Sequence, residues 1–367
     1  MNEIKALTSL RGIAAMMVVM QHFSATAERH AAVSIPSLVP HGYMAVDLFF
    51  VLSGFIMAYT YAADFALRGM RAMPSFLLKR AARILPLNTV VVCGIVVAGM
   101  LSVRLLGSNI FYVSTDLPVD IICNLLLLQG LDIGLNLNGP SWSISTEFAA
   151  YLLFPALLAL AFSRHRVVGA GTVVICFAAL VVTATGHSRL GLNVGSVGGE
   201  LTLCFAQFVL GLFIFRVTRI PAVRTRLGND WPAWLVAGWT AAALLLRIDL
   251  LAAIGFPLVV AALACNRGRV AELMATPVVY FLGEVSFSIY LVHDACRPVA
   301  LAVLRSLHPV PLGVFPALGF ALMASLAVVP LAWVAYVTVE RPGRRVIRRL
   351  AAAFIVEREL PGGSTRC

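Results

Sequence analysis

Long apolar stretches recur along this chain and constrain its fold more than any other feature of the sequence. Segments of roughly membrane-spanning length lie at 5–23, 43–62, 85–106, 143–163, 167–185, 198–216, 232–247, 249–266, 277–296 and 314–338. About 20 apolar residues in a helix cross the hydrocarbon core of a bilayer. With 60% hydrophobic residues, 12% charged residues and a mean hydropathy of +0.92, the chain is not a soluble globule. The sequence therefore predicts an all-α, polytopic integral membrane protein with about ten transmembrane helices.

The positively charged residues indicate how these helices are oriented. One shorter apolar stretch, Leu117–Leu131, decides the topology. If it spans the membrane, Arg164–Arg166 and Arg216–Arg226 lie outside, against the positive-inside tendency. If it lies on the outer surface or dips into it, those arginines are cytoplasmic. We favour the second arrangement, which places both termini in the cytoplasm, with 1–345 as one transmembrane domain and 346–367 as a short cytoplasmic tail.

The net charge of +11 follows from the same arginines. Because no basic stripe with interleaved aromatic residues is present, we expect the lipid bilayer as a partner and no nucleic acid. Seven scattered cysteines without a C-x-x-C pair give no support for a disulfide framework. Lys5 and Arg11 before an apolar core, with an A-x-A at 25–27, are also typical of a signal peptide, but Arg11 lies late for such a signal. We therefore expect the first helix to be retained.

An arginine and a histidine lie within the first apolar segment. Eleven positions separate Arg11 from His22, so a helix places both on one face, roughly 16 Å apart. Ionisable residues inside a membrane helix are costly and indicate a functional site. His22 is the best candidate for a general base, because an imidazole can accept a proton from a hydroxyl near neutral pH. A hydrogen-bonded core histidine is the competing interpretation.

Two carboxylates could orient His22 and stabilise its imidazolium. Asp47 lies at the expected start of the second helix, and Glu147 lies early in the fourth apolar segment. Either could instead satisfy free N–H groups at a helix N-terminus. Toward the outer ends of their helices we expect the acid and base residues His22, Asp47, Glu147 and His293, with Arg11 nearer the cytoplasm. This arrangement predicts a chamber with a basic inner mouth.

Two further arginines have a spacing suited to phosphate. Arg80 and Arg83 are three residues apart and therefore neighbours on a helix surface, where guanidinium groups can bind phosphate oxygens. Anchoring to anionic lipid headgroups is the competing interpretation. Ser53 and Gly54 lie about two turns below Asp47, where small residues also allow close helix packing.

His293 lies near the outer end of the ninth apolar segment and is followed by Asp294. The pair fits either a second polar wall of the chamber or an ordinary interfacial position. A zinc site built from His22, His293 and acids lacks a ligand spacing such as H-x-x-x-H, so we expect no metal.

Several motifs in a fixed order resemble the acyltransferase 3 family, bacterial membrane enzymes that O-acylate polysaccharides, lipopolysaccharide, peptidoglycan and Nod factors. The motifs are LRGIAAMMVVMQH, GYMAVDLFFVLSGF, KRAARILP, GPSWSISTEFAAYLLFP, FSIYLVH and ERPGRR, and they run from residue 5 to about residue 345. The resemblance implies a stand-alone, multi-pass acyltransferase of the bacterial cytoplasmic (inner) membrane, because we expect no SGNH-type domain after the tenth span.

The resemblance also implies roles for individual residues. It makes His22 the catalytic histidine and Arg11 its essential companion. The family's R-x-x-R, S-G-F and W-S-x-S-x-E motifs match Arg80, Arg83, Ser53 and Glu147. The R-x-x-R match implies contact with an acyl-CoA donor, most simply acetyl-CoA.

One departure from the family pattern concerns the acceptor. The aromatic pair that usually follows the glutamate is absent, because Phe148 is followed by two alanines before Tyr151. Trp142, Tyr151 and His293 remain the candidate acceptor-binding residues. Which carbohydrate they bind is left open by this departure.

We therefore expect an O-acyltransferase that moves an acyl group from cytoplasmic acyl-CoA to a hydroxyl of a cell-surface carbohydrate. His22 would act as the base or carry the acyl group itself. A second hypothesis is a transporter of a small solute or lipid-linked sugar, with the intramembrane charges as a proton relay. A third is a membrane scaffold for glycan synthesis.

Overall fold

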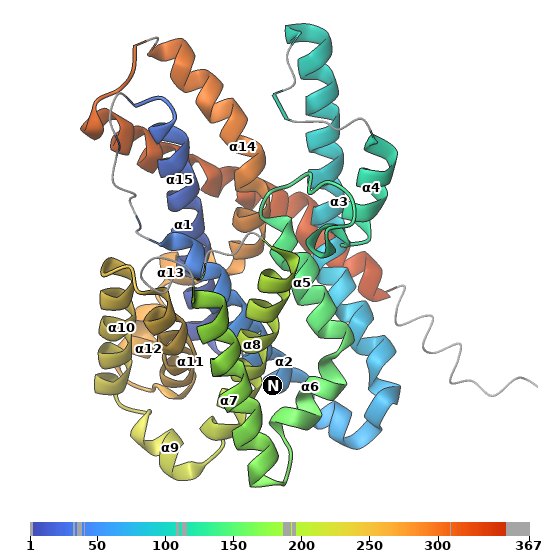
Figure 1. Ribbon diagram of the computed structural model, residues 1–367, viewed down its shortest axis with the longest axis vertical. Helices are drawn as coiled ribbons and strands as arrows, with labels where there is room; N and C mark the ends of the chain where they lie inside the picture. The colour runs from blue at the N-terminus through green and yellow to red at the C-terminus, as the bar shows by residue number, and fades with distance from the viewer. Residues whose placement is uncertain are drawn as a thin grey trace, which may run out of the picture.

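The computed structural model in Figure 1 describes residues 3–31, 34, 39, 41–107, 110–111, 116–185, 192, 196–308 and 310–349. These residues form helices and connecting turns, with an isolated bridge between Ala31 and Leu312. The all-α prediction is confirmed. Most of the expected tail, 350–367, lies outside the described residues, whereas 346–349 continue the last helix.

The helices follow one another through short links. In chain order they are α1 (Lys5–Glu28), α2 (Ala45–Arg68), α3 (Met73–Leu106), α4 (Leu117–Leu125), α5 (Ser141–Leu152), α6 (Phe154–Ala161), α7 (Arg166–Ala184), α8 (Val197–Thr218), α9 (Pro221–Arg226), α10 (Asp230–Leu245), α11 (Asp249–Cys265), α12 (Arg269–Met274), α13 (Pro277–Glu284), α14 (Ser286–Leu307) and α15 (Val314–Ala335). Short 3-10 turns lie at η1 (Gly42–Met44), η2 (Gly69–Ala72) and η3 (Gln129–Leu131), and a π-helical turn, η5 (Tyr336–Glu340), follows α15.

Several of these helices fit a membrane protein. Within the described residues, five helical stretches are long and apolar enough to cross a bilayer, and six if the bent pair α5 and α6 counts as one span. The expected number of about ten stays a prediction. Two of the expected spans correspond to α10 and α11, which contain 16 and 17 residues and are short for a full crossing.

The links between helices define two ends of the bundle. The α2–α3, α6–α7 and α8–α10 links gather at the bottom of Figure 1 and contain five arginines: Arg71, Arg164, Arg219, Arg224 and Arg226. We call this the basic end. The C-terminal ends of α1, α3 and α14 lie at the opposite end, at the top of the view. Which of the two ends faces the cytoplasm stays a prediction.

Two pairs of helices approach closely at glycine. A Cβ atom on Gly54 of α2 would lie 2.0 Å from the carbonyl oxygen of Phe208 on α8, and one on Gly283 of α13 would lie 2.1 Å from the carbonyl oxygen of Thr8 on α1. Glycine is required at both contacts, because any side chain there would push the backbones apart. The packing interpretation of Gly54 is therefore correct, and α1 is held in the interior against α2, α13, α14 and α15.

Two predicted segments are shorter or more bent than a simple span. The uncertain stretch at 117–131 forms α4, whose nine residues rise only about 14 Å and are too short to cross a membrane. The span expected at 143–163 is divided into α5 and α6, which meet at an angle of 70°. Pro155 in the first turn of α6 explains the break, because proline lacks the N–H that would continue the preceding helix.

Candidate functional site

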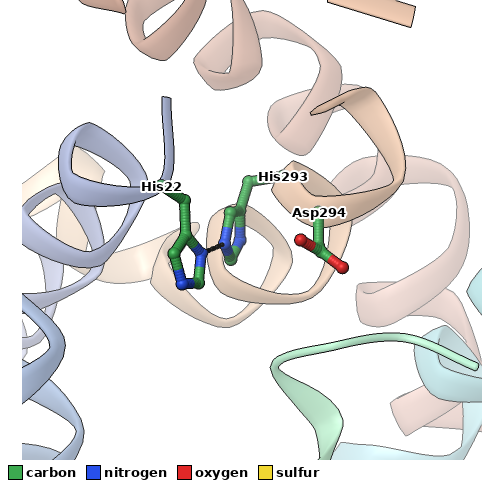
Figure 2. Close-up of side chains that lie close together, drawn as sticks. All are labelled: His22, His293 and Asp294. Carbon is green, nitrogen blue, oxygen red and sulfur yellow. Dashed lines mark hydrogen bonds between the residues drawn. The ribbon is translucent and has the colours of Figure 1, made fainter. Parts of the chain in front are cut away.

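Two histidines from distant parts of the chain meet inside the helix bundle. His22 on α1 and His293 on α14 place Nδ1 and Nε2, respectively, 2.8 Å apart. Their rings stack with centroids 5.0 Å apart and planes inclined by 20°. His293 is fully buried. Figure 2 shows the two rings side by side, with Asp294 on the far side of His293.

A second hydrogen bond fixes the proton positions in this pair. Nδ1 of His293 lies 2.6 Å from the carbonyl oxygen of Tyr290, which can only accept, so His293 carries its proton on Nδ1. Its Nε2 must then accept from Nδ1–H of His22. A neutral His22 is left with a lone pair on Nε2, the atom that would act as a base. The carboxylate expected to orient His22 is replaced by a neutral imidazole.

The arginines of the expected inner mouth surround a cavity near the middle of the bundle. The arginine cavity, as we call it, has a volume of about 180 Å³ and is lined by Arg11, Arg80 and Arg83 together with Ser53, Glu147 and Tyr151. Its remaining walls include Phe49, Phe287 and Tyr290. Arg11 therefore lies with the R-x-x-R arginines, and its distance of about 16 Å along α1 from His22 rules out direct contact.

Glu147 also lies in this cavity, which corrects the prediction that it belongs to the outer chamber. Ser53 and Tyr151 both donate hydrogen bonds to its Oε1. The physical reason is depth, because Glu147 is nearly two turns beyond Ser141, the first residue of α5. Tyr151, expected to bind the acceptor, is on the arginine side as well.

The guanidinium groups of the arginine cavity outnumber its carboxylates and are not directly paired with them. Among the described residues, none of Arg11, Arg80 and Arg83 forms an ion pair within 4.0 Å. Arg80 instead donates to Tyr61 Oη at 3.4 Å and lies over the Tyr61 ring, while Arg83 lies over the ring of Phe287. With three guanidinium groups against the one carboxylate of Glu147, the lining of the cavity carries a net positive charge, which favours an anionic ligand.

Glu340, a residue the sequence reasoning did not select, lies beside this set. It is buried in η5 and accepts hydrogen bonds from Ser288 at 2.7 Å and from Arg344 at 2.5 Å. A Cβ on Gly343 would lie 2.4 Å from Cβ of Pro86, so the helical segment after η5 packs tightly against α3 about one turn beyond Arg83. The signal for Glu340 in the sequence is the ERPGRR motif, of which it is the first residue.

Asp47 is apart from both histidines and from the arginine cavity. Its side chain is buried, and its Oδ1 has no hydrogen-bond partner within the described residues. The groups that act on its carboxylate are Gln207 of α8 and Asp249 of α11, and α2 packs against both helices. The prediction that Asp47 orients His22 is therefore wrong, because the first turn of α2 faces α8 at this point.

A second cavity lies at the opposite end of the bundle. This outer cavity has a volume of about 700 Å³ and its lining includes Thr26, Arg29, Gly139, Asp294, Arg297 and Arg305. Trp142 lines neither cavity and packs edge-on against Phe50. The expected role of Trp142 as part of an acceptor pocket is thus not supported by its position.

The histidine pair lies between the two cavities. Along α1 the order is Arg11 in the arginine cavity, His22 in the pair, and Thr26 in the outer cavity. Along α14 the same order is repeated by Tyr290, His293 and Asp294. Neither imidazole is among the residues that line the two cavities, but on both helices the histidine pair lies between the residues of the arginine cavity and those of the outer cavity, and we call this pair the partition.

The loop before α5 holds this partition in place. Asn138 donates to the carbonyl oxygen of Leu291 at 3.0 Å, and the Gly139 N–H donates to Asp294 at 3.1 Å. Tyr290 donates to the carbonyl oxygen of Pro140 at 3.1 Å. The N-G-P stretch therefore fixes the segment of α14 that carries His293.

The same residues could in principle hold a metal ion. One ligand atom from each of His22, His293 and Asp294 lies within 4.8 Å of the others. Two nitrogens bound to one tetrahedral zinc ion are about 3.3 Å apart, given Zn–N bonds of about 2.0–2.1 Å. The observed 2.8 Å is a hydrogen-bond distance, so the geometry favours a direct imidazole–imidazole contact.

Comparisons with known proteins place the chain in a family. The acyltransferase MdmB of Streptomyces mycarofaciens is 30% identical over 158 residues, which cover 42% of this chain and 38% of that protein. The protein 2 in picA locus of Rhizobium radiobacter is 30% identical over 168 residues, covering 40% of this chain and 78% of that protein. No solved structure matches the chain. The sequence profile of an acyltransferase domain matches residues 4–337, nearly the whole chain, and the protein therefore belongs to the acyltransferase 3 family.

Proposed function

We propose that this protein is a membrane O-acyltransferase that moves an acyl group, most simply acetyl, from acyl-CoA to a hydroxyl of a carbohydrate. The observation that carries the proposal is the position of the partition: along α1 and α14, two hydrogen-bonded imidazoles lie between a cationic cavity and an outer cavity. Transfer from an anionic donor in the arginine cavity to a hydroxyl in the outer cavity needs a base between the two cavities, where the histidine pair lies. Family membership supports the same reaction class.

The donor would occupy the arginine cavity. Arg11, Arg80 and Arg83 would bind its phosphates through guanidinium hydrogen bonds, and the thioester would extend along α14 toward His22. Acyl-CoA is cytoplasmic, so the basic end would face the cytoplasm, in agreement with the positive-inside tendency. The bilayer would be the bacterial cytoplasmic (inner) membrane, with residues 1–345 as one transmembrane domain and both termini inside.

The chemistry follows from the proton positions. Nε2 of His22 would take the proton of the acceptor hydroxyl, while the hydroxyl oxygen attacks the thioester carbonyl carbon. A C–O bond forms, the C–S bond breaks, and the thiolate of CoA receives the proton from His22. His293 would hold the ring by accepting from Nδ1–H throughout, as the carboxylate does in a catalytic triad. An acyl-histidine formed first on Nε2 uses the same geometry.

The test is acyl transfer by purified protein in lipid nanodiscs, combined with mass spectrometry of surface glycans from cells with and without the gene. Replacement of His22 by alanine should abolish transfer, because the loss of a general base costs about 10²–10⁴-fold in rate. His165→Ala, in the exposed α6–α7 link, is the matched control. Unchanged acylation by the His22 variant at normal abundance would remove His22 from the mechanism. Solute uptake into liposomes without consumption of acyl-CoA would favour the transporter hypothesis instead.

A further inference from the structure

The outer cavity carries an unusual charge for its position. It lies between α14 and the upper half of α3 in Figure 1, at the end of the bundle remote from the basic links. Its lining nevertheless contains three arginines, Arg29, Arg297 and Arg305, against one carboxylate, Asp294. Arginine is disfavoured on the outer side of a membrane protein by the positive-inside tendency. Topology therefore does not explain these residues.

The one carboxylate of this cavity is already satisfied. Asp294 pairs with Arg297 at 2.6 Å and accepts from the Gly139 N–H at 3.1 Å. Arg297 also donates to Thr26 Oγ1 at 3.2 Å. Within the described residues, Arg29 and Arg305 form no ion pair. The cavity thus presents two positive charges that no protein carboxylate compensates.

Helix ends account for these two arginines only in part. Arg29 is the C-cap of α1, and Arg305 lies in the last turn of α14. Cations at helix C-termini are favourable because of the helix dipole. The dipole explains why each arginine is tolerated, but it does not explain why two helices direct their terminal arginines to the same cavity.

We infer that the outer cavity binds an acceptor glycan that carries an anionic group, a carboxylate or a phosphate, held by Arg29 and Arg305. The inference rests on the proposed function and adds the chemical class of the acceptor. Seven residues of α1 separate His22 from Arg29, a rise of about 10 Å. The charged group and the reacting hydroxyl would therefore lie on different parts of an extended glycan.

The experiment compares three matched acceptors with the full-length protein in phosphatidylcholine nanodiscs. The acceptors are a glucose tetrasaccharide, the same chain with one glucuronate, and the same chain with one glucose 6-phosphate. With acetyl-CoA as donor, the charged acceptors should show KM values about tenfold or more below that of the neutral one, the scale of a charge-assisted hydrogen bond. Comparing the glucuronate and phosphate chains tells which anion the site takes.

Variants locate the effect. Arg29→Gln and Arg305→Gln should raise KM for the charged acceptors toward the neutral value, with kcat and the neutral acceptor changed less than about twofold. Both residues are exposed, so the fold should be retained. Arg104→Gln, an exposed arginine at the same end of the bundle that does not line the cavity, is the control and should behave as the wild type.

A binding measurement separates this inference from the proposed function. Equilibrium dialysis of the three tetrasaccharides without donor should show tighter binding of the charged chains, lost in the Arg29 and Arg305 variants. If charged chains bind more tightly but no acyl group is ever transferred, the proposed reaction is wrong and the proposed anion-binding site is supported. Equal KM values and equal binding for charged and neutral chains would overturn the site. So would binding of added phosphatidylglycerol that depends on Arg29 and Arg305 while the three tetrasaccharides bind equally.

Discussion

The hydroxyl of Ser288 on α14 donates a 2.7 Å hydrogen bond to Glu340, which lies 52 positions later in the chain. Glu340 in turn pairs with Arg344 at 2.5 Å, and the carboxylate is completely buried. Its position in a π-helical turn is notable because such turns are frequent at functional sites. The contact ties the end of α15 to the wall of the arginine cavity.

Replacement of Glu340 by glutamine should weaken donor binding. The variant keeps a hydrogen-bond acceptor for Ser288 but leaves the Arg344 charge without its partner, and the packing of Gly343 on Pro86 transmits the change to the segment of α3 that carries Arg83. We expect KM for acyl-CoA to rise about tenfold, with a smaller effect on kcat, and stability to fall by up to about 3–5 kcal/mol. Steady-state kinetics and thermal unfolding measure both. Glu284→Gln, an exposed glutamate on α13, should change neither value.

The role of His293 can be separated from that of His22 by the choice of substitution. His293→Leu removes the acceptor for Nδ1–H of His22, so the ring loses both its orientation and its preferred tautomer. His293→Gln keeps a carbonyl oxygen that can accept the same hydrogen bond. We expect single-turnover transfer to fall by about 10²-fold or more in the leucine variant and by clearly less in the glutamine variant. Equal losses in both variants would contradict an orienting role.

The arginine cavity predicts a dependence on the charge of the donor. Arg80→Gln and Arg83→Gln should each raise KM for acetyl-CoA by about tenfold or more, the loss expected for a charge-assisted hydrogen bond. Arg83→Lys should recover part of the loss, since it keeps the charge without the planar fork. Acetyl-pantetheine, which lacks the nucleotide phosphates, should be a poor donor that is insensitive to these substitutions. A donor preference unaffected by either arginine would exclude phosphate binding here.

Much of the architecture could be predicted from the sequence because apolar segments specify helices directly. Arg80 and Arg83 can be placed together from the sequence, because residues three or four apart share a helix face whatever the tertiary fold. For Gly54 the sequence leaves packing and function open, and the close contact with α8 supports packing. The pairing of His22 with His293 could not be obtained in this way. It depends on how α1 and α14 cross, and 271 positions of chain lie between the two residues.

The carboxylates show the same limit more sharply. Asp47 and Glu147 were both assigned to the neighbourhood of His22 from their depth along the chain. The position of a residue in an apolar segment gives neither its exact depth, which for Glu147 is nearly two turns into α5, nor the direction in which its side chain points around the helix. Asp47 faces α8, and Glu147 accepts from Ser53 and Tyr151 on the arginine side. A short apolar helix with two buried polar residues, such as α4 with Asp120 and Asn124, is equally hard to place from apolar periodicity alone.

Removal of metal should leave the reaction unchanged. The ligand atoms of His22, His293 and Asp294 are close enough to bind an ion, yet the 2.8 Å contact leaves no room for one between the two nitrogens. In addition, Asp294 is engaged by Arg297 and by the Gly139 N–H. Protein treated with EDTA and dialysed should transfer acyl groups at the rate of the untreated enzyme. Mass spectrometry of metals should find less than about 0.1 zinc per chain, whereas a protein with a tight zinc site would contain about one. Inhibition by added Zn²⁺ is expected, because the ion would compete for the His22 lone pair that the proton transfer needs. The opposite outcome is loss of activity on chelation that added zinc restores and buffer alone does not. It would make the two histidines ligands of a metal centre and would exclude His22 as the base.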